Sequence, residues 1–120
     1  MDTSFFASNL DDSSVFQIRL AAFSQVPHEV RPIWNDSEVL FDQVLQHVGR
    51  NHITKPGQDS EWHKLGASIE IPPGTRSVVI SLGAGMVDSN ADKSNHYLDD
   101  VRVSLVDSPR TTYADNLNKP

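Results

Sequence analysis

The segment spanning residues 88–92 reads Asp-Ser-Asn-Ala-Asp, so an oxygen-bearing side chain recurs at every second position. A tight loop with this spacing can direct several oxygens at one hard cation, and Ca²⁺ takes about six to eight oxygen ligands. Counted as an EF-hand loop from Asp88, Asn90 is position 3, Asp92 is position 5 and Asp99 is position 12. Position 6 is lysine rather than glycine and position 12 is not glutamate, so the match is partial. The alternative is a solvated turn, in which Asp and Asn tolerate unusual backbone angles.

Asp99 is also a candidate ligand because of its place in the strand predicted over His96–Val106. Alternation puts Asp99 on one face with apolar and aromatic side chains, and we expect that face to point inward. Its other members are Tyr97, Val101, Val103 and Leu105. A buried carboxylate is costly unless it is hydrogen-bonded or metal-bound. We therefore expect Asp99 to accept loop amides or to bind a cation, and Asp100 to point outward.

Ring side chains are candidates for contacting a sugar, since a flat ring stacks on a pyranose while polar neighbours bond its hydroxyls. The candidates are Trp34, Trp62, His63, His96 and Tyr97. For Trp62, at a strand start, core packing is the main alternative; for Trp34, in a polar loop, packing and binding are equally supported. Four polar residues lie in the loop predicted before Trp62: Arg50, Asn51, His52 and Lys55. They are candidates for binding the ligand, and the alternative is that they are simply solvated.

Catalysis finds little support, and we expect a protein that is not an enzyme; a small hydrolase is the remaining enzymatic alternative. The sequence has no Gly-x-Ser-x-Gly motif, no glycine-rich phosphate loop and no carboxylate pair whose spacing marks an acid and a base. The five histidines lack the close spacing of a zinc site. The chain contains no cysteine, which excludes disulfides, thiolate metal sites and a cysteine nucleophile.

Composition narrows the class of partner. The 120 residues carry a formal net charge of −6, and no run of Lys and Arg occurs, so nucleic acid is not expected as a ligand. An acidic surface suits a neutral ligand, a cation or simple solubility. No apolar run approaches the roughly 20 residues of a membrane span. The N-terminus lacks the basic start and apolar core of a signal peptide, which leaves a cytoplasmic protein or one whose leader has been removed.

The elements that must position these residues are mainly strands. Alternating apolar residues predict a half-buried strand over Val15–Leu20, and continuous apolar runs or alternation predict strands at Trp62–Ile71 and Ser77–Leu82. The last two would form a hairpin around the turn Pro72-Pro73-Gly74-Thr75, because prolines are excluded from a central ladder. Strands separated by Pro/Gly turns, with little helix, indicate an all-β, antiparallel sandwich.

Two other regions are less regular. Residues 24–36 contain two prolines and are predicted to form a loop that Trp34 anchors. Residues 37–48 place five apolar residues on one helical face, between Ser37 as a cap and Gly49 as an end, although their β-branched and aromatic content also permits a strand. We predict a polar N-terminal segment at 1–14, one domain at 15–106 and a polar tail at 107–120.

The second half of the chain resembles a known family. Three motifs carry the resemblance: Trp62-x-x-Leu65, then Ile69-x-Ile71 running into Pro72-Pro73-Gly74-Thr75, and finally His96-Tyr97-Leu98-Asp99-Asp100-Val101. The pattern is similar to the second half of the galactose-binding-like jelly-roll domains, which include many carbohydrate-binding modules. It covers about half the chain, from Trp62 to Leu105.

The resemblance implies a jelly-roll-like sandwich, a carbohydrate ligand, an extracellular or cell-surface location and a strand rather than a helix at 37–48. Many such domains hold a structural calcium to which the last-strand motif contributes, here Asp99 or Asp100. The usual N-terminal Glu ligand has no clear match. Such domains also begin with further strands, whereas about fourteen largely polar residues precede Val15 here. A shortened N-terminal part, or one supplied by a partner, would leave a sheet edge that needs covering.

By its resemblance to carbohydrate-binding modules, the chain is expected to be a non-catalytic, carbohydrate-binding module, with Ca²⁺ as a candidate structural cofactor. The alternative function is a structural or assembly domain that binds another protein, or a second copy, through a sheet edge or face. The residues expected to bind the ligand are Trp34, Arg50, Asn51, His52, Trp62, His96 and Tyr97. Those expected to bind the cation are Asp88, Asn90, Asp92, Asp99 and Asp100.

Overall fold

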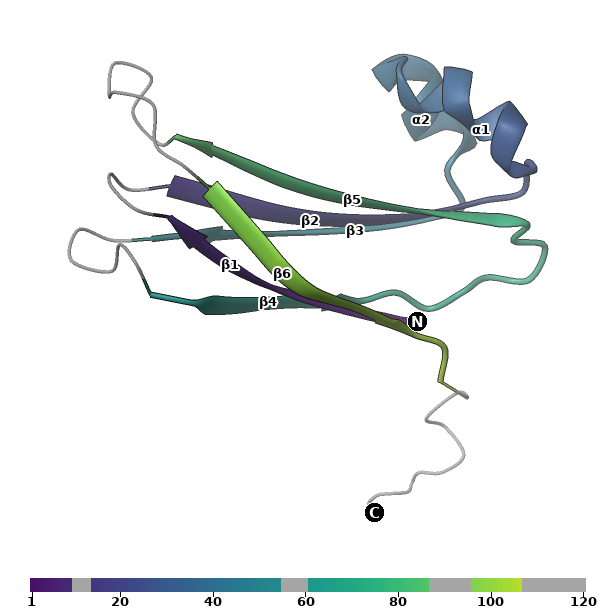
Figure 1. Ribbon diagram of the computed structural model, residues 1–120. Helices are drawn as coiled ribbons and strands as arrows, with labels where there is room; N and C mark the ends of the chain where they lie inside the picture. The colour runs from purple at the N-terminus through teal and green to yellow at the C-terminus, as the bar shows by residue number, and fades with distance from the viewer. Residues whose placement is uncertain (10–13, 55–60, 87–95, 107–120) are drawn as a thin grey trace.

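A computed structural model describes residues 1–9, 14–54, 61–86 and 96–106 of the chain. Two antiparallel, three-stranded sheets face each other (Figure 1). The first, called the β1 sheet here, has the order β4 (His63–Ser68), β1 (Asp2–Asn9) and β6 (His96–Ser104). The second, the β2 sheet, has the order β3 (Gln46–Ile53), β2 (Ser14–Phe23) and β5 (Ser77–Met86). The predicted all-β sandwich is confirmed.

The core lies between the two middle strands. Alternate residues of β2 point inward, and Phe16, Ile18 and Leu20 have no exposed surface. They pack against the inward residues of β1 and β4, among them Phe5 and Leu65. Burying a large apolar side chain contributes about 1.5–3 kcal/mol, so this layer is the main source of stability for the sandwich.

The N-terminal residues depart from the polar segment predicted over 1–14. Residues 2–9 form β1, which is the middle strand of its sheet, so the domain includes them. Thr3, Phe5 and Ala7 are at most 2% exposed, which is the period-two burial of a strand. Two of these three inward residues are small or polar, and the pattern is therefore weak in the sequence. The N-terminal amino group of Met1 donates a hydrogen bond to the Ile69 carbonyl at 2.7 Å, which ties the strand end to the segment after β4.

The predicted hairpin Trp62–Leu82 is wrong. The strands at its two ends belong to different sheets, since β4 pairs with β1 and β5 pairs with β2. The turn itself forms, because the Thr75 amide and hydroxyl both donate to the Pro72 carbonyl, at 3.3 and 2.7 Å, and Gly74 has φ of 87°. It acts as the corner at which the chain crosses from one sheet to the other. Among the described strands only β2 and β3 are consecutive neighbours in one sheet, so most connections cross between the two sheets.

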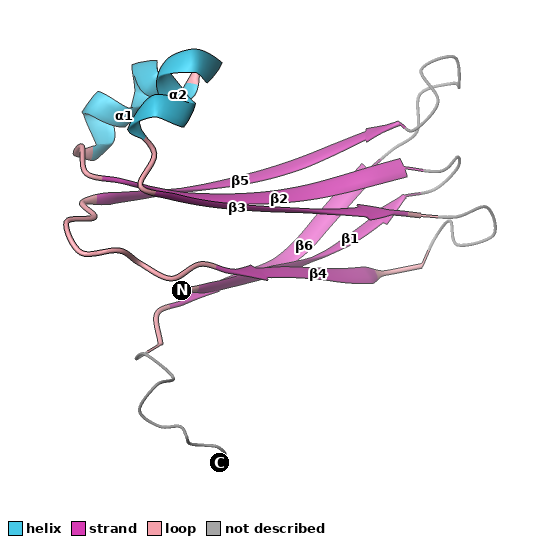
Figure 2. Ribbon diagram, turned by 180° about the vertical axis from the view of Figure 1, so that it is seen from behind, coloured by secondary structure: helices cyan, strands magenta, loops and turns pink. Residues whose placement is uncertain are grey.

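Two short helices cover one end of the outer face of the β2 sheet (Figure 2). Residues 24–36, predicted as a loop, contain α1 (Pro27–Trp34), whose first turn is suited to proline. Residues 37–48 divide between the two predicted alternatives: α2 occupies Ser37–Gln43, and β3 begins at Gln46. The cap of α2 is Asp36 rather than Ser37, because its Oδ1 accepts the Glu38 amide at 3.2 Å. Neither helix in the described part of the chain is long and apolar enough to cross a bilayer.

The strand β6 differs from prediction in the direction of its side chains. Its pairing with β1 is interrupted between Ser4 and Phe6, and Asp100 there has a positive φ of 52°. This bulge moves the alternation by one residue, so Tyr97 and Asp99 do not share a face with Val103. Asp99 is exposed rather than buried. The predicted inward face of Tyr97, Val101, Val103 and Leu105 is likewise exposed, because β6 is an edge strand that the β2 sheet does not cover.

Candidate functional site

The outer face of the β1 sheet is the candidate binding surface. Residues paired across antiparallel strands point to the same side of a sheet. Ser4 pairs with Gly66 and Arg102, and Phe6 pairs with Lys64 and Asp99. Since Phe5 points into the core, these neighbours point outward. The same register adds Asp2, Ser8, Ser68, Tyr97 and Ser104 to this surface, which is called the β1 face below.

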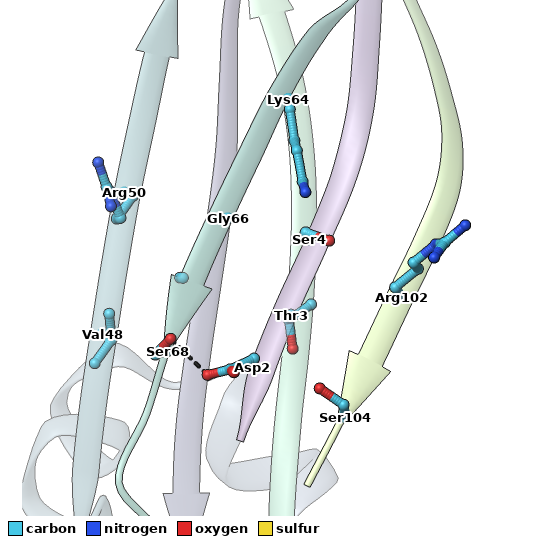
Figure 3. Close-up of a pocket in the computed structure, with 11 residues that line it drawn as sticks. Asp2, Thr3, Ser4, Val48, Arg50, Lys64, Gly66, Ser68, Arg102 and Ser104 are labelled. Carbon is cyan, nitrogen blue, oxygen red and sulfur yellow. Dashed lines mark hydrogen bonds between the residues drawn. The ribbon is translucent and has the colours of Figure 1, made fainter. Parts of the chain in front are cut away.

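A pocket of about 680 Å³ occupies the part of the β1 face near the start of β1 (Figure 3). Its lining is mostly small or polar and includes Ser4, Gly66 and Ser68. No side chain rises from β4 at Gly66, which leaves the middle of the pocket open. The Ser68 hydroxyl donates to the Asp2 carboxylate at 2.6 Å. The remaining lining residues are Thr3, Val48, Arg50, Lys64, Ala67, Arg102 and Ser104.

Positive charge surrounds this pocket. Lys64 comes from β4, Arg102 from β6 and Arg50 from the edge strand β3 of the other sheet, and Figure 3 shows Ser4 between Lys64 and Arg102. Arg102 donates from Nε to the Asp100 carboxylate at 2.9 Å, and its side chain remains 76% exposed. The hydrogen bond to Asp100, and then the charge of that carboxylate, raise the pKa of Arg102. Asp2 is the one acidic residue that lines the pocket among the described residues.

Aromatic side chains gather at the opposite end of the β1 face. Tyr97, opposite Ser8, is 44% exposed. Trp62 precedes β4 and is 53% exposed; the alternation of β4, continued by one residue, places it on the same side as Lys64. Ser8 lies between these positions and is only 4% exposed although it belongs to the outer face, so neighbouring side chains cover it. The β1 face thus carries exposed rings at one end and a charged, polar pocket at the other.

Trp34 and Asn51, two further residues predicted to bind ligand, lie on the opposite side of the molecule. Trp34 packs against the cluster of Ala21, Phe23, Val30 and Leu40 between the helices and the β2 sheet, and the Arg19 guanidinium lies 5.1 Å from its ring centroid. Asn51 accepts a hydrogen bond from Gln17 at 3.2 Å. Neither residue reaches the β1 face.

Two predicted histidines join the two sheets instead of lining the pocket. The His52 ring of β3 lies 4.8 Å from the His63 ring of β4, and burial, followed by the charge of His63, lowers the pKa of His52. His96 Nε2 lies 2.9 Å from the Ser14 hydroxyl, and its ring meets Phe16 edge-on with centroids 5.8 Å apart. Of the seven predicted ligand-binding residues, the structure therefore brings Trp62 and Tyr97 to the β1 face, and Arg50 lines its pocket from strand β3 of the other sheet.

The predicted cation ligands are only partly within the described residues. Asp88, Asn90 and Asp92 lie outside them. Asp99 accepts the Asp100 amide at 2.8 Å, and Asp100 is engaged by Arg102. Two carboxylates, one already in an ion pair, fall short of the roughly six oxygens that Ca²⁺ requires. Among the described residues no group of three His, Cys, Asp or Glu side chains could hold a metal ion, and the calcium site stays a prediction.

The sequence did not single out the residues that line the pocket, apart from Arg50. Asp2 and Ser4 belonged to a segment predicted to be merely polar, and Lys64 and Arg102 are isolated basic residues far apart in the chain. Only the pairing of β4 and β6 with β1 brings them together. The alternation of Thr3, Phe5 and Ala7 was the one signal that could have revealed this strand. No family model matches the chain, and no curated protein or solved structure matches it either.

Proposed function

We propose that this protein is a non-catalytic carbohydrate-binding module whose ligand lies along the β1 face. The observation that carries the proposal is the combination, on one sheet surface, of the exposed rings of Trp62 and Tyr97 with a polar pocket. Aromatic rings stack on the apolar faces of sugars, and hydroxyl, carboxylate and amine groups bond their hydroxyls. Groups for both kinds of contact lie on one open sheet surface, which suits a chain-like ligand.

The dimensions of the β1 face also suit an oligosaccharide. Trp62 and Ser68 mark the two ends of the face along β4, and they are six residues apart. With a rise of about 3.3 Å per residue, the face is about 20 Å long, enough for several sugar units. The strands of a sheet hold their side chains in fixed positions, so little order has to be imposed when the ligand binds.

A glycan array followed by calorimetry on the best ligand tests the proposal. Aromatic residues at the centre of an interface commonly contribute about 2 kcal/mol or more, so Trp62→Ala and Tyr97→Ala should each weaken binding by about 30-fold. Trp34→Ala is the matched control, because this ring packs under the helices on the far side. The proposal fails if no glycan binds, or if Trp34→Ala abolishes binding while Trp62→Ala and Tyr97→Ala leave it intact.

An assembly domain is the second candidate function, and the edge strand β6 is the observation that favours it. Leu98 and Val103 pair with Ala7 and Thr3, so they point to the core side of the β1 sheet, yet they are 40% and 49% exposed. Apolar side chains and backbone groups at an uncovered edge are typical of a surface that pairs with another chain. Light scattering over a range of concentrations tests self-association: a rising mass that Leu98→Ser and Val103→Ser abolish supports it, and a monomer throughout contradicts it.

A further inference from the structure

We infer that the ligand of the β1 face is an acidic polysaccharide, whose carboxylate or sulfate groups enter the pocket between Lys64 and Arg102. The inference rests on the proposed function, and it adds the chemical class of the sugar. It is independent of the rings, since Trp62 and Tyr97 would stack on neutral and acidic sugars alike.

The distribution of charge is the first support for this inference. The chain as a whole carries a net charge of −6. Six basic residues fall within the described part of the chain, and three of them, Arg50, Lys64 and Arg102, line this one pocket. The Debye length is about 8 Å at physiological ionic strength, so a bound group responds to these nearby charges more than to the net charge. The pocket is locally positive on an acidic protein.

The acidic neighbours of the pocket are already engaged. The Asp2 carboxylate accepts the Ser68 hydroxyl at 2.6 Å, and the Asp100 carboxylate accepts Arg102 Nε at 2.9 Å. The Arg102–Asp100 pair is exposed, with side chains 76% and 43% accessible, and ion pairs in water contribute little to stability. Guanidinium groups carry five N–H donors, so Arg102 can hold a ligand anion while it keeps Asp100, or exchange one for the other at little cost.

Hydroxyl groups supply the neutral donors that an oxyanion needs. Ser4 and Ser104 line the pocket beside the cations. Thr3 lines it too, although its side chain points to the core side of β1. Hydrogen bonds to a charged acceptor are about twice as strong as neutral ones. A ligand oxyanion within the pocket would accept such bonds from the hydroxyls of Ser4 and Ser104.

Matched polymers and matched variants test the inference on the intact chain. Dextran sulfate is compared with dextran, and polygalacturonate with its fully methylated ester, so each pair differs only in the anionic group. The two arms also distinguish a sulfate from a carboxylate ligand. We expect at least one acidic polymer to bind more than tenfold tighter than its neutral partner. Lys64→Gln and Arg102→Gln should each weaken that binding about tenfold, because each removes a charge-assisted hydrogen bond. Arg76→Gln, in the separate pocket beside α1, is the control and should leave binding unchanged.

The outcomes separate this inference from the proposed function. Binding to neutral polymers alone, with Trp62→Ala still weakening it, overturns the acidic ligand and leaves the carbohydrate-binding module standing. Binding to no polymer and no glycan overturns both. Two further results would mean that the protein attracts any polyanion, and they would overturn the assigned pocket. One is an equal loss of affinity for the acidic polymer in Lys64→Gln, Arg102→Gln and Arg76→Gln. The other is an affinity for single-stranded DNA equal to that for the acidic polymer.

Discussion

Two adjacent phenylalanines test the placement of β1 most simply. Phe5 is fully buried in the core, whereas Phe6 lies on the β1 face and is half-buried. Truncating a buried phenylalanine to alanine costs about 3–5 kcal/mol, through lost transfer energy and the cavity left behind. For Phe6→Ala, which leaves no sealed cavity, we expect the free energy of unfolding to fall by about 1–1.5 kcal/mol. Small domains have about 5–15 kcal/mol of stability in total, so Phe5→Ala alone should remove roughly a fifth of it or more.

Urea denaturation followed by tryptophan fluorescence measures both variants against the parent chain. The midpoint should fall much further for Phe5→Ala than for Phe6→Ala, with similar slopes if both variants unfold in two states. If Phe5→Ala does not fold, Phe5→Leu and Phe6→Leu repeat the comparison at smaller cost, since swaps that nearly conserve volume cost under about 1.5 kcal/mol. A loss for Phe6 that equals or exceeds the loss for Phe5 would refute β1 as the middle strand with Phe5 inward.

Three other predictions concern the junctions between elements. Burial and the charge of His63 lower the pKa of His52, so near the ordinary value of 6.5 the unfolded chain binds more protons than the folded one. The free energy of unfolding should therefore fall as the pH drops through this region. Urea titrations between about pH 5.5 and 7.5 should show a smaller dependence on pH for His52→Gln, and an unchanged dependence would contradict the contact between His52 and His63. Thr54→Val removes the buried hydroxyl that accepts the Ser14 amide at 2.8 Å. It should lower the free energy of unfolding by about 1–3 kcal/mol, measured by urea denaturation. Unchanged stability would count against this hydrogen bond as a link between the ends of β2 and β3. Trp34→Ala should lower stability by about 2 kcal/mol through lost packing and the contact with Arg19, and unchanged stability would contradict its place in the helix cluster.

The sequence predicted the sandwich because its two strongest strands follow simple patterns. Phe16, Ile18 and Leu20 alternate, and the region of β5 is a continuous apolar run. The strand β3 was predicted only in part, as one of two alternatives for residues 37–48, because it is an edge strand and most of its residues are polar or exposed. The pairing of β4 and β5 was misjudged because a Pro/Gly turn specifies a change of direction without specifying which sheet receives the next strand.

The candidate site was predictable only in part, for a similar reason. Residue type alone marked Trp62 and Tyr97 as binding candidates, and both are exposed on the β1 face. Lys64 and Arg102 carry no such mark, because their proximity depends on the register of two strands with a third. The bulge at Asp100 also reversed the direction expected for half of β6, and no feature of the sequence pattern announces it.

The most direct test of the β1 face as the binding surface is a map of amide chemical shifts in an NMR titration with the oligosaccharide that binds best. We predict that the perturbed amides cluster on β1, β4 and β6, with the largest changes near Tyr97, Lys64 and Ser4. The outer face of the β2 sheet, around Gln17 and Asn51, should be unaffected. Perturbations centred on β2, β3 and β5, with none on the β1 face, would contradict the proposed site.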